Sequence, residues 1–241
     1  MESMVYVAQP SPFQDEGVSP LANQTYVWLA DAIVRGELQP GSHVSEPWIS
    51  TKLGISRSPV REALLSLLDA GVLTRERGRG FRVAEADPQS ACEFYDCRIL
   101  IEPECARLAG PHIDDEVVAT AQRAFDEMAA AQERHAYGDR LNASENFHRA
   151  YRAVCPNRHL VQIVNRTAAR GLQLRAFGIS RPGTLEQSLE QHRLILDAFR
   201  AREPFHTLVE DVLRFSKERV LFTLTAREHD RPAERKGPTH D

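Results

Sequence analysis

The chain has few of the features that mark secreted, membrane-bound or thiolate-metal proteins. Its four cysteines, Cys92, Cys97, Cys105 and Cys155, show no Cys-x-x-Cys spacing, so neither a disulfide framework nor a thiolate zinc site is indicated. No run approaches the roughly 18 apolar residues that a membrane span needs, and no basic segment followed by an apolar one opens the chain. We expect a cytoplasmic protein with no membrane partner.

Motifs of catalysis are equally scarce. The sequence has no phosphate-binding glycine loop, no nucleophile–base arrangement and no His-Glu-x-x-His spacing. An enzyme that uses His148 and His192 inside a helical bundle is therefore a weaker hypothesis than a binding protein. The net charge of -4 also gives no whole-chain reason to bind nucleic acid, so any contact with DNA must come from local charge.

Length and patterning divide the chain into two domains. With 241 residues, 42% of them hydrophobic, the chain exceeds one typical domain and can bury a core. Residues 1–18 and the tail 228–241 are polar and without pattern, so we expect both to be disordered. A charged stretch at 84–87 separates an N-terminal domain, 19–84, from an all-helical domain, 88–227.

The N-terminal domain has the order of a helix-turn-helix. Helical spacing predicts a first helix over 21–35, followed by a turn in "LQPGSHVS". Ser45 can then cap a short helix over 46–53, which Gly54 ends, and the next helix begins at Ser58 and Pro59. Two helices joined by a tight glycine turn are typical of a helix-turn-helix.

A β-hairpin and a cluster of basic residues follow. Apolar stretches at 72–75 and 81–84, joined by "ERGRG", predict a hairpin that would form a wing. Between residues 52 and 82, seven basic residues against three acidic ones give a local charge of +4. Arg57 and Arg61 project together from the start of a helix, where phosphate is favoured, and arginine can also bind guanine edges. A solvated charged face is the alternative.

From Pro88 onward only helical patterns appear, and they predict six helices. Arg98 and Glu102 lie one turn apart on the first of them. The side chains of this helix that we expect to face the core are those of Phe94, Cys97, Ile101, Cys105 and Leu108. Arg98 and Glu102 then form either a surface ion pair or part of a binding site.

The stretch "GELQPGSHVSEPWISTKLGISRSPVREALLSLLDAGVLTRERGRGFRVAE" resembles the GntR-family winged helix-turn-helix. "FYDCRILIEPECARLAG" and "ENFHRAY" resemble the FadR-type (FCD) sensor domain with six helices, of the VanR-like kind. The resemblance implies a homodimeric transcription repressor on a palindromic operator. It places Arg57, Ser58 and Arg61 at the DNA with Lys52 nearby, and brings the wing residues Arg77, Gly78 and Arg79 into the minor groove. Pro47 stands where this family commonly has an arginine, so one DNA contact is missing.

The same resemblance implies a ligand pocket in the helical domain. Arg98 corresponds to an arginine that binds an anionic effector, often a carboxylate, with two parallel hydrogen bonds. The usual divalent-metal ligands of the family correspond to Ser144, His148, His192 and Arg214. Serine is a poor zinc ligand and arginine cannot coordinate a cation, so the usual site is incomplete and no metal is expected to be obligatory.

Three interpretations of this pocket stay open. Glu145, His148 and His192 can hold zinc or nickel, since Glu-x-x-His spacing occurs in metal sites of helical bundles. Alternatively, Arg214 replaces the metal, and an anion binds among Arg98, His148, His192 and Arg214, which is the interpretation we favour. In the third, the histidines are core residues without a ligand. We expect effector binding to change the placement of the winged domains through the linker 84–87.

Overall fold

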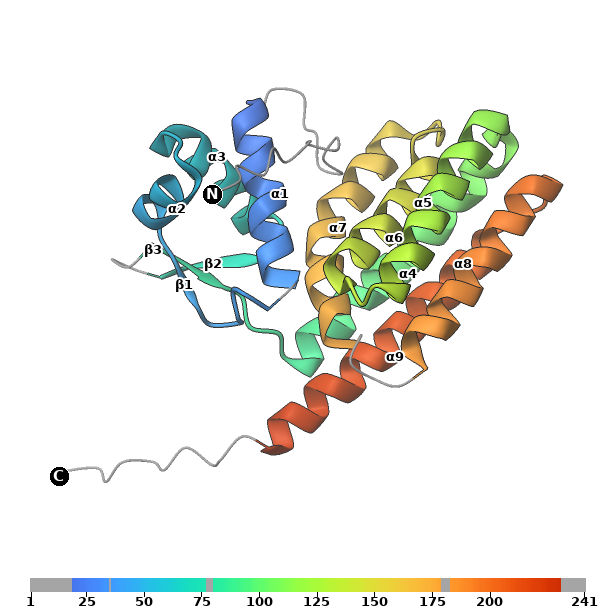
Figure 1. Cartoon of the computed structure of the whole chain (residues 1–241). Coiled ribbons are helices and arrows are strands. Elements are labelled where there is room, and N and C mark those ends of the chain that lie inside the picture. The colour runs from blue at the N-terminus through green and yellow to red at the C-terminus, as the bar shows by residue number, and fades with distance from the viewer. Residues whose placement is uncertain (1–18, 35, 77–79, 179–182, 231–241) are drawn as a thin grey trace.

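The computed structural model describes residues 19–34, 36–76, 80–178 and 183–230. A small winged domain and a larger helical domain lie side by side, as predicted (Figure 1). The predicted disorder of 1–18 lies outside the described residues, as does most of the predicted tail. Within the described part of the chain, no helix has both the length and the apolar character needed to cross a bilayer.

The winged domain contains three helices and a three-stranded antiparallel sheet of order β1-β3-β2. The elements are α1 (Pro20–Val34), β1 (His43–Val44), α2 (Glu46–Leu53), α3 (Arg57–Asp69), β2 (Leu73–Glu76) and β3 (Gly80–Val83). The predicted cap is confirmed, because Ser45 accepts a hydrogen bond from the backbone amide of Trp48 at 3.4 Å. Gly54 ends α2 in the left-handed conformation, with φ 67°, which a glycine adopts without strain.

The sequence did not indicate β1. The segment predicted as a turn contains His43 and Val44, which pair with Arg82 and Phe81 of β3. Two residues are too few to show the alternation by which a strand is recognised. The extra strand matters because it attaches the hairpin to the start of α2.

Six α-helices and one short 3-10 helix form the second domain within the described residues, which confirms the predicted number of helices. They are α4 (Pro88–Ala109), η1 (Gly110–His112), α5 (Asp115–Glu133), α6 (Tyr137–Arg152), α7 (Arg158–Gly178), α8 (Thr184–Ala201) and α9 (His206–Asp230). Asp87 caps α4 by accepting a hydrogen bond from the amide of Ser90 at 2.8 Å. Because α9 continues to Asp230, the predicted start of the tail at 228 is three residues too early.

The buried face of α4 differs from the predicted one. Cys97 is exposed, whereas Tyr95, Arg98 and Glu102 are buried. The guanidinium of Arg98 and the carboxylate of Glu102 form an ion pair, and this mutual neutralisation allows both charges to be buried. A pattern of apolar residues cannot reveal such a face, since it leaves open whether a charged residue lies at the surface or in the interior.

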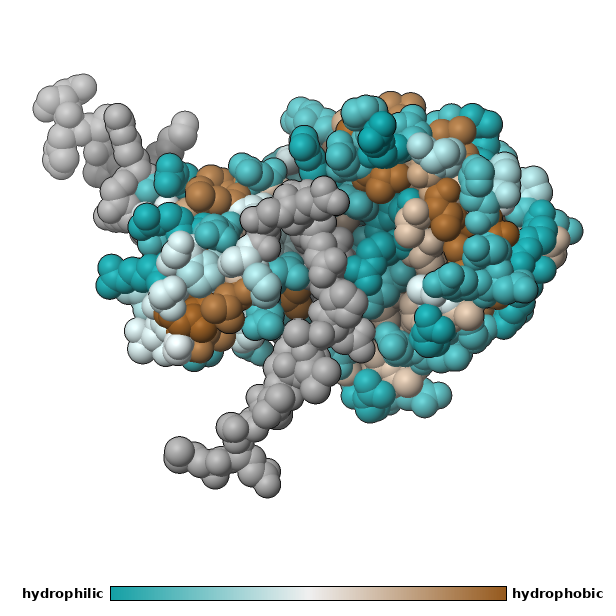
Figure 2. Space-filling view, turned by 90° about the horizontal axis from the view of Figure 1, so that it is seen from above, coloured by the Kyte–Doolittle hydropathy of each residue, from teal (hydrophilic) through white to brown (hydrophobic). Residues whose placement is uncertain are grey.

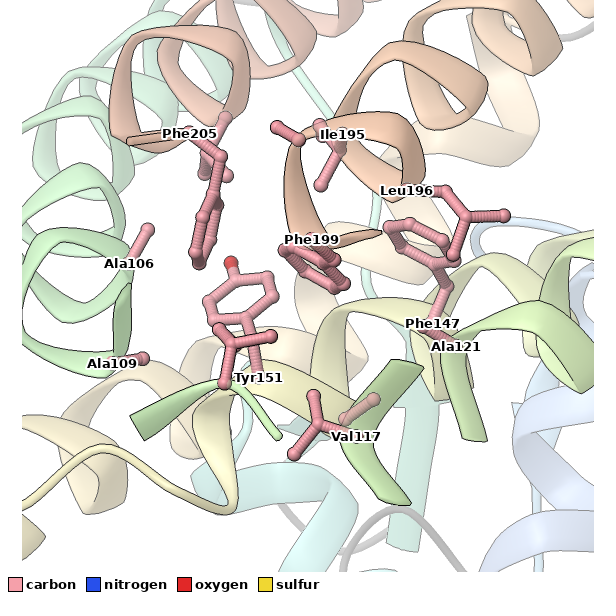
Figure 3. Packing of buried hydrophobic residues seen from close by; sticks show 14 of the residues in the cluster. Ala106, Ala109, Val117, Ala121, Phe147, Tyr151, Ile195, Leu196, Phe199 and Phe205 are labelled. Atoms are coloured by element: carbon pink, nitrogen blue, oxygen red, sulfur yellow. The ribbon is translucent and has the colours of Figure 1, made fainter. Parts of the chain in front are cut away.

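Aromatic side chains from α6, from α8 and from Phe205, which directly precedes α9, form the centre of the helical core (Figure 3). The rings of Phe147 and Phe199 stack with centroids 5.8 Å apart, and those of Phe199 and Phe205 meet edge-on at 4.6 Å. Phe147 also contacts the ring of His192 at 5.1 Å. The core therefore fixes the position of a buried histidine next to polar groups of α6.

Candidate functional site

The first turn of α3 presents a basic surface. Arg57, Ser58 and Arg61 are all exposed there. The Nε and Nη2 groups of Arg61 donate to the two carboxylate oxygens of Glu46 at 2.9 and 2.8 Å, and this bond lowers the pKa of Glu46. The Arg61 side chain stays 63% exposed. The pair therefore joins α2 to α3 and leaves the guanidinium accessible.

Lys52 lies on α2 beside two tryptophans. Its ammonium group is 5.6 Å from the ring centroid of Trp28 and 5.4 Å from that of Trp48. Both contacts are within cation–π range, which restrains an otherwise flexible cation. The wing residues Arg77, Gly78 and Arg79, which were assigned to DNA, lie outside the described residues.

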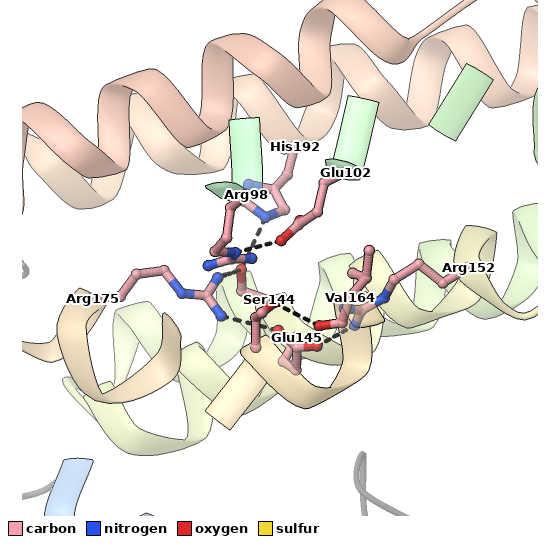
Figure 4. A network of polar contacts seen from close by, with 9 residues as sticks. Arg98, Glu102, Ser144, Glu145, Arg152, Val164, Arg175 and His192 are labelled. Carbon is pink, nitrogen blue, oxygen red and sulfur yellow. Dashed lines mark hydrogen bonds and ion pairs between the residues drawn. The ribbon is translucent and has the colours of Figure 1, made fainter. Parts of the chain in front are cut away.

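A network of buried charges occupies the helical domain (Figure 4). The carboxylate of Glu145 accepts hydrogen bonds from Arg152 and from Nη2 of Arg175, the latter at 3.1 Å. Burial acts to raise the pKa of Glu145, but the positive charges of Arg152 and Arg175 outweigh it and lower that pKa. Together with the pair of Arg98 and Glu102, three guanidinium groups face two carboxylates, so the network carries one excess positive charge.

His192 joins this network as a neutral ring. Its Nδ1 donates to the carbonyl of Ser188 at 2.7 Å, so Nε2 accepts from the hydroxyl of Ser144 at 3.0 Å. Ser144 in turn accepts from Nη1 of Arg175 at 3.1 Å. Burial lowers the pKa of His192 to about 3, and burial is also the largest cause that lowers the pKa of His148 well below its usual value. The two rings, 5.0 Å apart, are therefore uncharged near neutral pH.

Two of the three residues considered as metal ligands, His192 and Glu145, have other partners, whereas Nδ1 of His148 is buried without one among the described residues. Both ring nitrogens of His192 are used, and the Glu145 carboxylate is bound by two arginines. Within the described ranges there is no group of three or more histidine, cysteine, aspartate or glutamate side chains arranged to hold a metal ion. The guanidinium of Arg175 donates to the Ser144 hydroxyl and to the Glu145 carboxylate, so it uses oxygen atoms that would otherwise be available to coordinate a cation.

A cavity of about 40 Å³ adjoins this network, between α6, α7, α8 and α9. Three arginines line it: Arg140, Arg175 and Arg219. His192 and four hydroxyl groups, those of Ser144, Thr184, Ser188 and Ser216, also line it. Among the described residues that line this cavity, none is acidic. Nε of Arg175, Nε of Arg219 and Oγ1 of Thr184 are buried without a hydrogen-bond partner, so polar groups are available for a ligand.

Two of the residues predicted to bind the effector, Arg98 and Arg214, do not line this cavity. Arg214 faces solvent on α9, is 59% exposed and donates to Glu210 at 2.9 and 2.6 Å. The next residue, Phe215, projects from the helix about 100° away from Arg214 and lines the cavity instead. Arg98 is buried in its pair with Glu102 and does not line the cavity. Of the predicted contacts, His192 lines the cavity and His148 lies behind it.

Sequence reasoning missed Arg140, Arg175 and Arg219. For Arg175, a pattern was present: it follows the buried residues Val164, Ala168 and Leu172 at spacings of four, four and three, on one face of α7. An arginine on such a face is a candidate for a buried charge.

Two family models match the chain. The model for bacterial regulatory proteins of the gntR family matches residues 21–83, and the FCD domain matches residues 93–205. A probable D-xylose utilization operon transcriptional repressor of Paenarthrobacter nicotinovorans is 30% identical over 186 residues, 76% of this chain and 80% of that protein. The HTH-type transcriptional repressor GlaR of Escherichia coli (strain K12) is 26% identical over 187 residues, 74% of this chain and 84% of that protein.

A solved structure has the same fold. The chain of E. coli McbR/YncC superposes with a TM-score of 0.71 at 22% identity, covering 87% of this chain and 99% of that one. Both the winged domain and the helical domain fall within this match.

Proposed function

Because the chain belongs to the GntR family of bacterial regulatory proteins and carries an FCD domain, we propose that it is a repressor controlled by a small anionic effector. Like its family and its relatives, the chain is a DNA-binding transcription regulator and not an enzyme. FCD domains bind small-molecule effectors. The single observation that supports an anion is the cavity lined by Arg140, Arg175 and Arg219 without an acidic side chain among its described lining residues.

Charge and hydrogen bonding favour a hydroxylated carboxylic acid. A guanidinium offers two parallel N–H donors to a carboxylate, and the three arginines come from α6, α7 and α9. Arg140 has no carboxylate among its hydrogen-bond partners, since it donates to the side-chain oxygen of Gln132 and the carbonyl of Leu185. Burial, followed by the positive charge of Arg175, lowers the pKa of Arg140 to about 10, which still leaves it charged near neutral pH. The hydroxyl groups around the cavity would bind hydroxyl groups of the acid.

The size of the cavity makes binding a conformational event. A volume of about 40 Å³ has room for roughly one or two water molecules. An acid with several carbon atoms exceeds this volume, and we propose that it moves the lining helices apart when it binds. The free energy of effector binding is in this way linked to the arrangement of the helices in the sensor domain. A regulator requires such a link between ligand binding and conformation.

We assign DNA binding to the exposed start of α3. Arg57, Ser58 and Arg61 would contact the duplex there, with Lys52 of α2 at its edge. A homodimer would place two such surfaces on the two half-sites of a palindromic operator. Release of the operator on effector binding is the direction that we propose.

We also propose that the effector binds without a metal ion. The guanidinium of Arg175, which donates to Ser144, supplies the positive charge that a metal cation would supply. Both ring nitrogens of His192 already form hydrogen bonds, to Ser144 and Ser188. After dialysis, elemental analysis should find clearly less than one zinc or nickel ion per chain. Stoichiometric metal that disappears in His148→Ala would overturn this part of the proposal.

The effector proposal is tested by thermal unfolding with acetate, L-lactate, L-malate and citrate, and with glycerol as a neutral control. A bound acid at 100 times its dissociation constant stabilises the protein by about 2.7 kcal/mol and raises its Tm accordingly. The increase should vanish in Arg175→Ala, compared with that variant's own baseline, and persist in the matched surface variant Arg214→Ala. Absence of any shift with all four acids, or an equal shift in Arg175→Ala, would contradict the proposal.

A further inference from the structure

Gln173 of α7 is buried and forms hydrogen bonds to the winged domain. Its Nε2 donates to the carbonyl of Ala84 at 3.1 Å and, more weakly, to that of Val72 at 3.5 Å. Val72 precedes β2 and Ala84 follows β3, and the amide of Ala84 donates to the carbonyl of Val72 at 2.9 Å. One side chain of the helical domain thus holds both ends of the wing hairpin at its base.

A neighbouring arginine fixes the orientation of this amide. Nη1 of Arg170 donates to the side-chain oxygen of Gln173, which directs the NH2 group of Gln173 toward the hairpin. Nη2 of Arg170 donates at 3.3 Å to the carbonyl of Glu85, in the linker between the domains. Successive bonds from one turn of α7 therefore reach the wing and the linker together.

The same turn of α7 forms part of the charged network at the cavity. Gly171 lies against the guanidinium of Arg98, and a Cβ atom there would collide with it. Arg175 follows Gln173 by two residues, only about 3 Å along the helix axis, and binds Ser144 and Glu145. The groups that contact the cavity and those that hold the wing are therefore joined by less than one turn of rigid helix.

We propose that Gln173 is the residue through which the occupied cavity acts on the winged domain, an inference that rests on the proposed effector control. An acid that binds Arg175 competes with Ser144 and Glu145 for its donors and enlarges the cavity, so α7 moves. Movement of α7 stretches or breaks the bonds of Gln173 to the hairpin base. The effector therefore binds with different free energies to the two domain arrangements, the one in which these bonds are intact and the one in which they are broken. A ligand can shift the domain arrangement only by such a difference in binding free energy.

The test uses full-length protein and L-malate, with heat of binding and tryptophan emission measured in parallel titrations. The only two tryptophans, Trp28 and Trp48, both lie in the winged domain, and Trp28 is on α1, which packs against α7. We compare the wild type with Gln173→Leu and with Gln162→Leu, a matched change at an exposed position of the same helix. Arg170→Ala, which leaves Gln173 in place without its orienting bond, is the second variant if Gln173→Leu does not fold.

In the wild type and Gln162→Leu, emission should change along the binding curve. In Gln173→Leu, L-malate should bind at least as tightly as in the wild type, because the bonds that binding has to break are already absent, while the emission change is lost. Arg170→Ala should also lose the emission change. A variant that binds L-malate and keeps the full emission change overturns the role of Gln173 only. Wild-type protein that binds none of the acids overturns the proposed function, and this inference with it.

Discussion

The two buried histidines make the stability of the protein sensitive to mild acid. His148 and His192 have pKa values below those of the unfolded chain, and that of His192 is about 3. Unfolded histidine has a pKa of about 6.5, so between these values the unfolded chain binds more protons than the folded one. Stability is therefore full above about pH 6.5 and falls as the pH decreases toward the folded pKa values.

The magnitude follows from the unfolded pKa alone. Between pH 7.5 and pH 5.5, each histidine that stays neutral in the fold costs about 1.4 kcal/mol of unfolding free energy, so the pair costs roughly 3 kcal/mol. For a chain of this length, the Tm should fall by about 6–12 °C. Carboxyl groups add little in this window, because their unfolded pKa values lie near 4.

The assay is thermal unfolding of the wild type and of His148→Gln/His192→Gln at both pH values. Each protein is compared with itself, so any packing loss in the variant cancels. The double variant should show a much smaller difference between pH 7.5 and 5.5, while His159→Gln, a control at an exposed position, should behave as the wild type. A double variant that loses as much stability in acid as the wild type would refute the claim that these rings are buried and neutral.

Three further results are expected. Arg57→Ala should weaken operator binding and lower the slope of log affinity against log salt by about one, in fluorescence anisotropy with Arg214→Ala as control. Glu145→Gln removes the carboxylate that pairs with two buried arginines and should destabilise the fold by about 3–5 kcal/mol in urea unfolding; a loss below about 1 kcal/mol would contradict the network. Gly171→Ala forces a methyl group against the buried Arg98 at a cost of about 1–3 kcal/mol, partly offset by the roughly 1 kcal/mol by which alanine favours a helix over glycine; a variant that is stabilised by that full amount, about 1 kcal/mol, in the same assay would contradict the contact.

Local chemistry made much of the winged domain predictable. The cap at Ser45, the left-handed glycine at 54 and the apolar stripe of α3 each depend on a few adjacent residues, and the structure confirms these helices. The strand β1 could not be predicted, because its pairing with β3 brings together residues about 40 positions apart.

The cavity was less predictable for a geometric reason. On a helix, an error of one position moves a side chain by about 100°, which is enough to exchange the solvent-facing Arg214 for the cavity-lining Phe215. The burial of Arg98 and Glu102 depends on their pairing within a packed interior, and no hydropathy pattern contains that information. A basic pocket was nevertheless anticipated, although with other arginines than those that line this cavity.

The most direct test of the account is the anisotropy of labelled DNA from upstream of the protein's own gene, titrated with wild type and Arg175→Ala, with and without L-malate. The account predicts that the wild type binds this DNA and that L-malate weakens its binding severalfold, by a factor within the typical range of about 5–150. Arg175→Ala should bind the DNA without responding to the acid. Equal responses of the two proteins to L-malate would contradict control through the arginine-lined cavity.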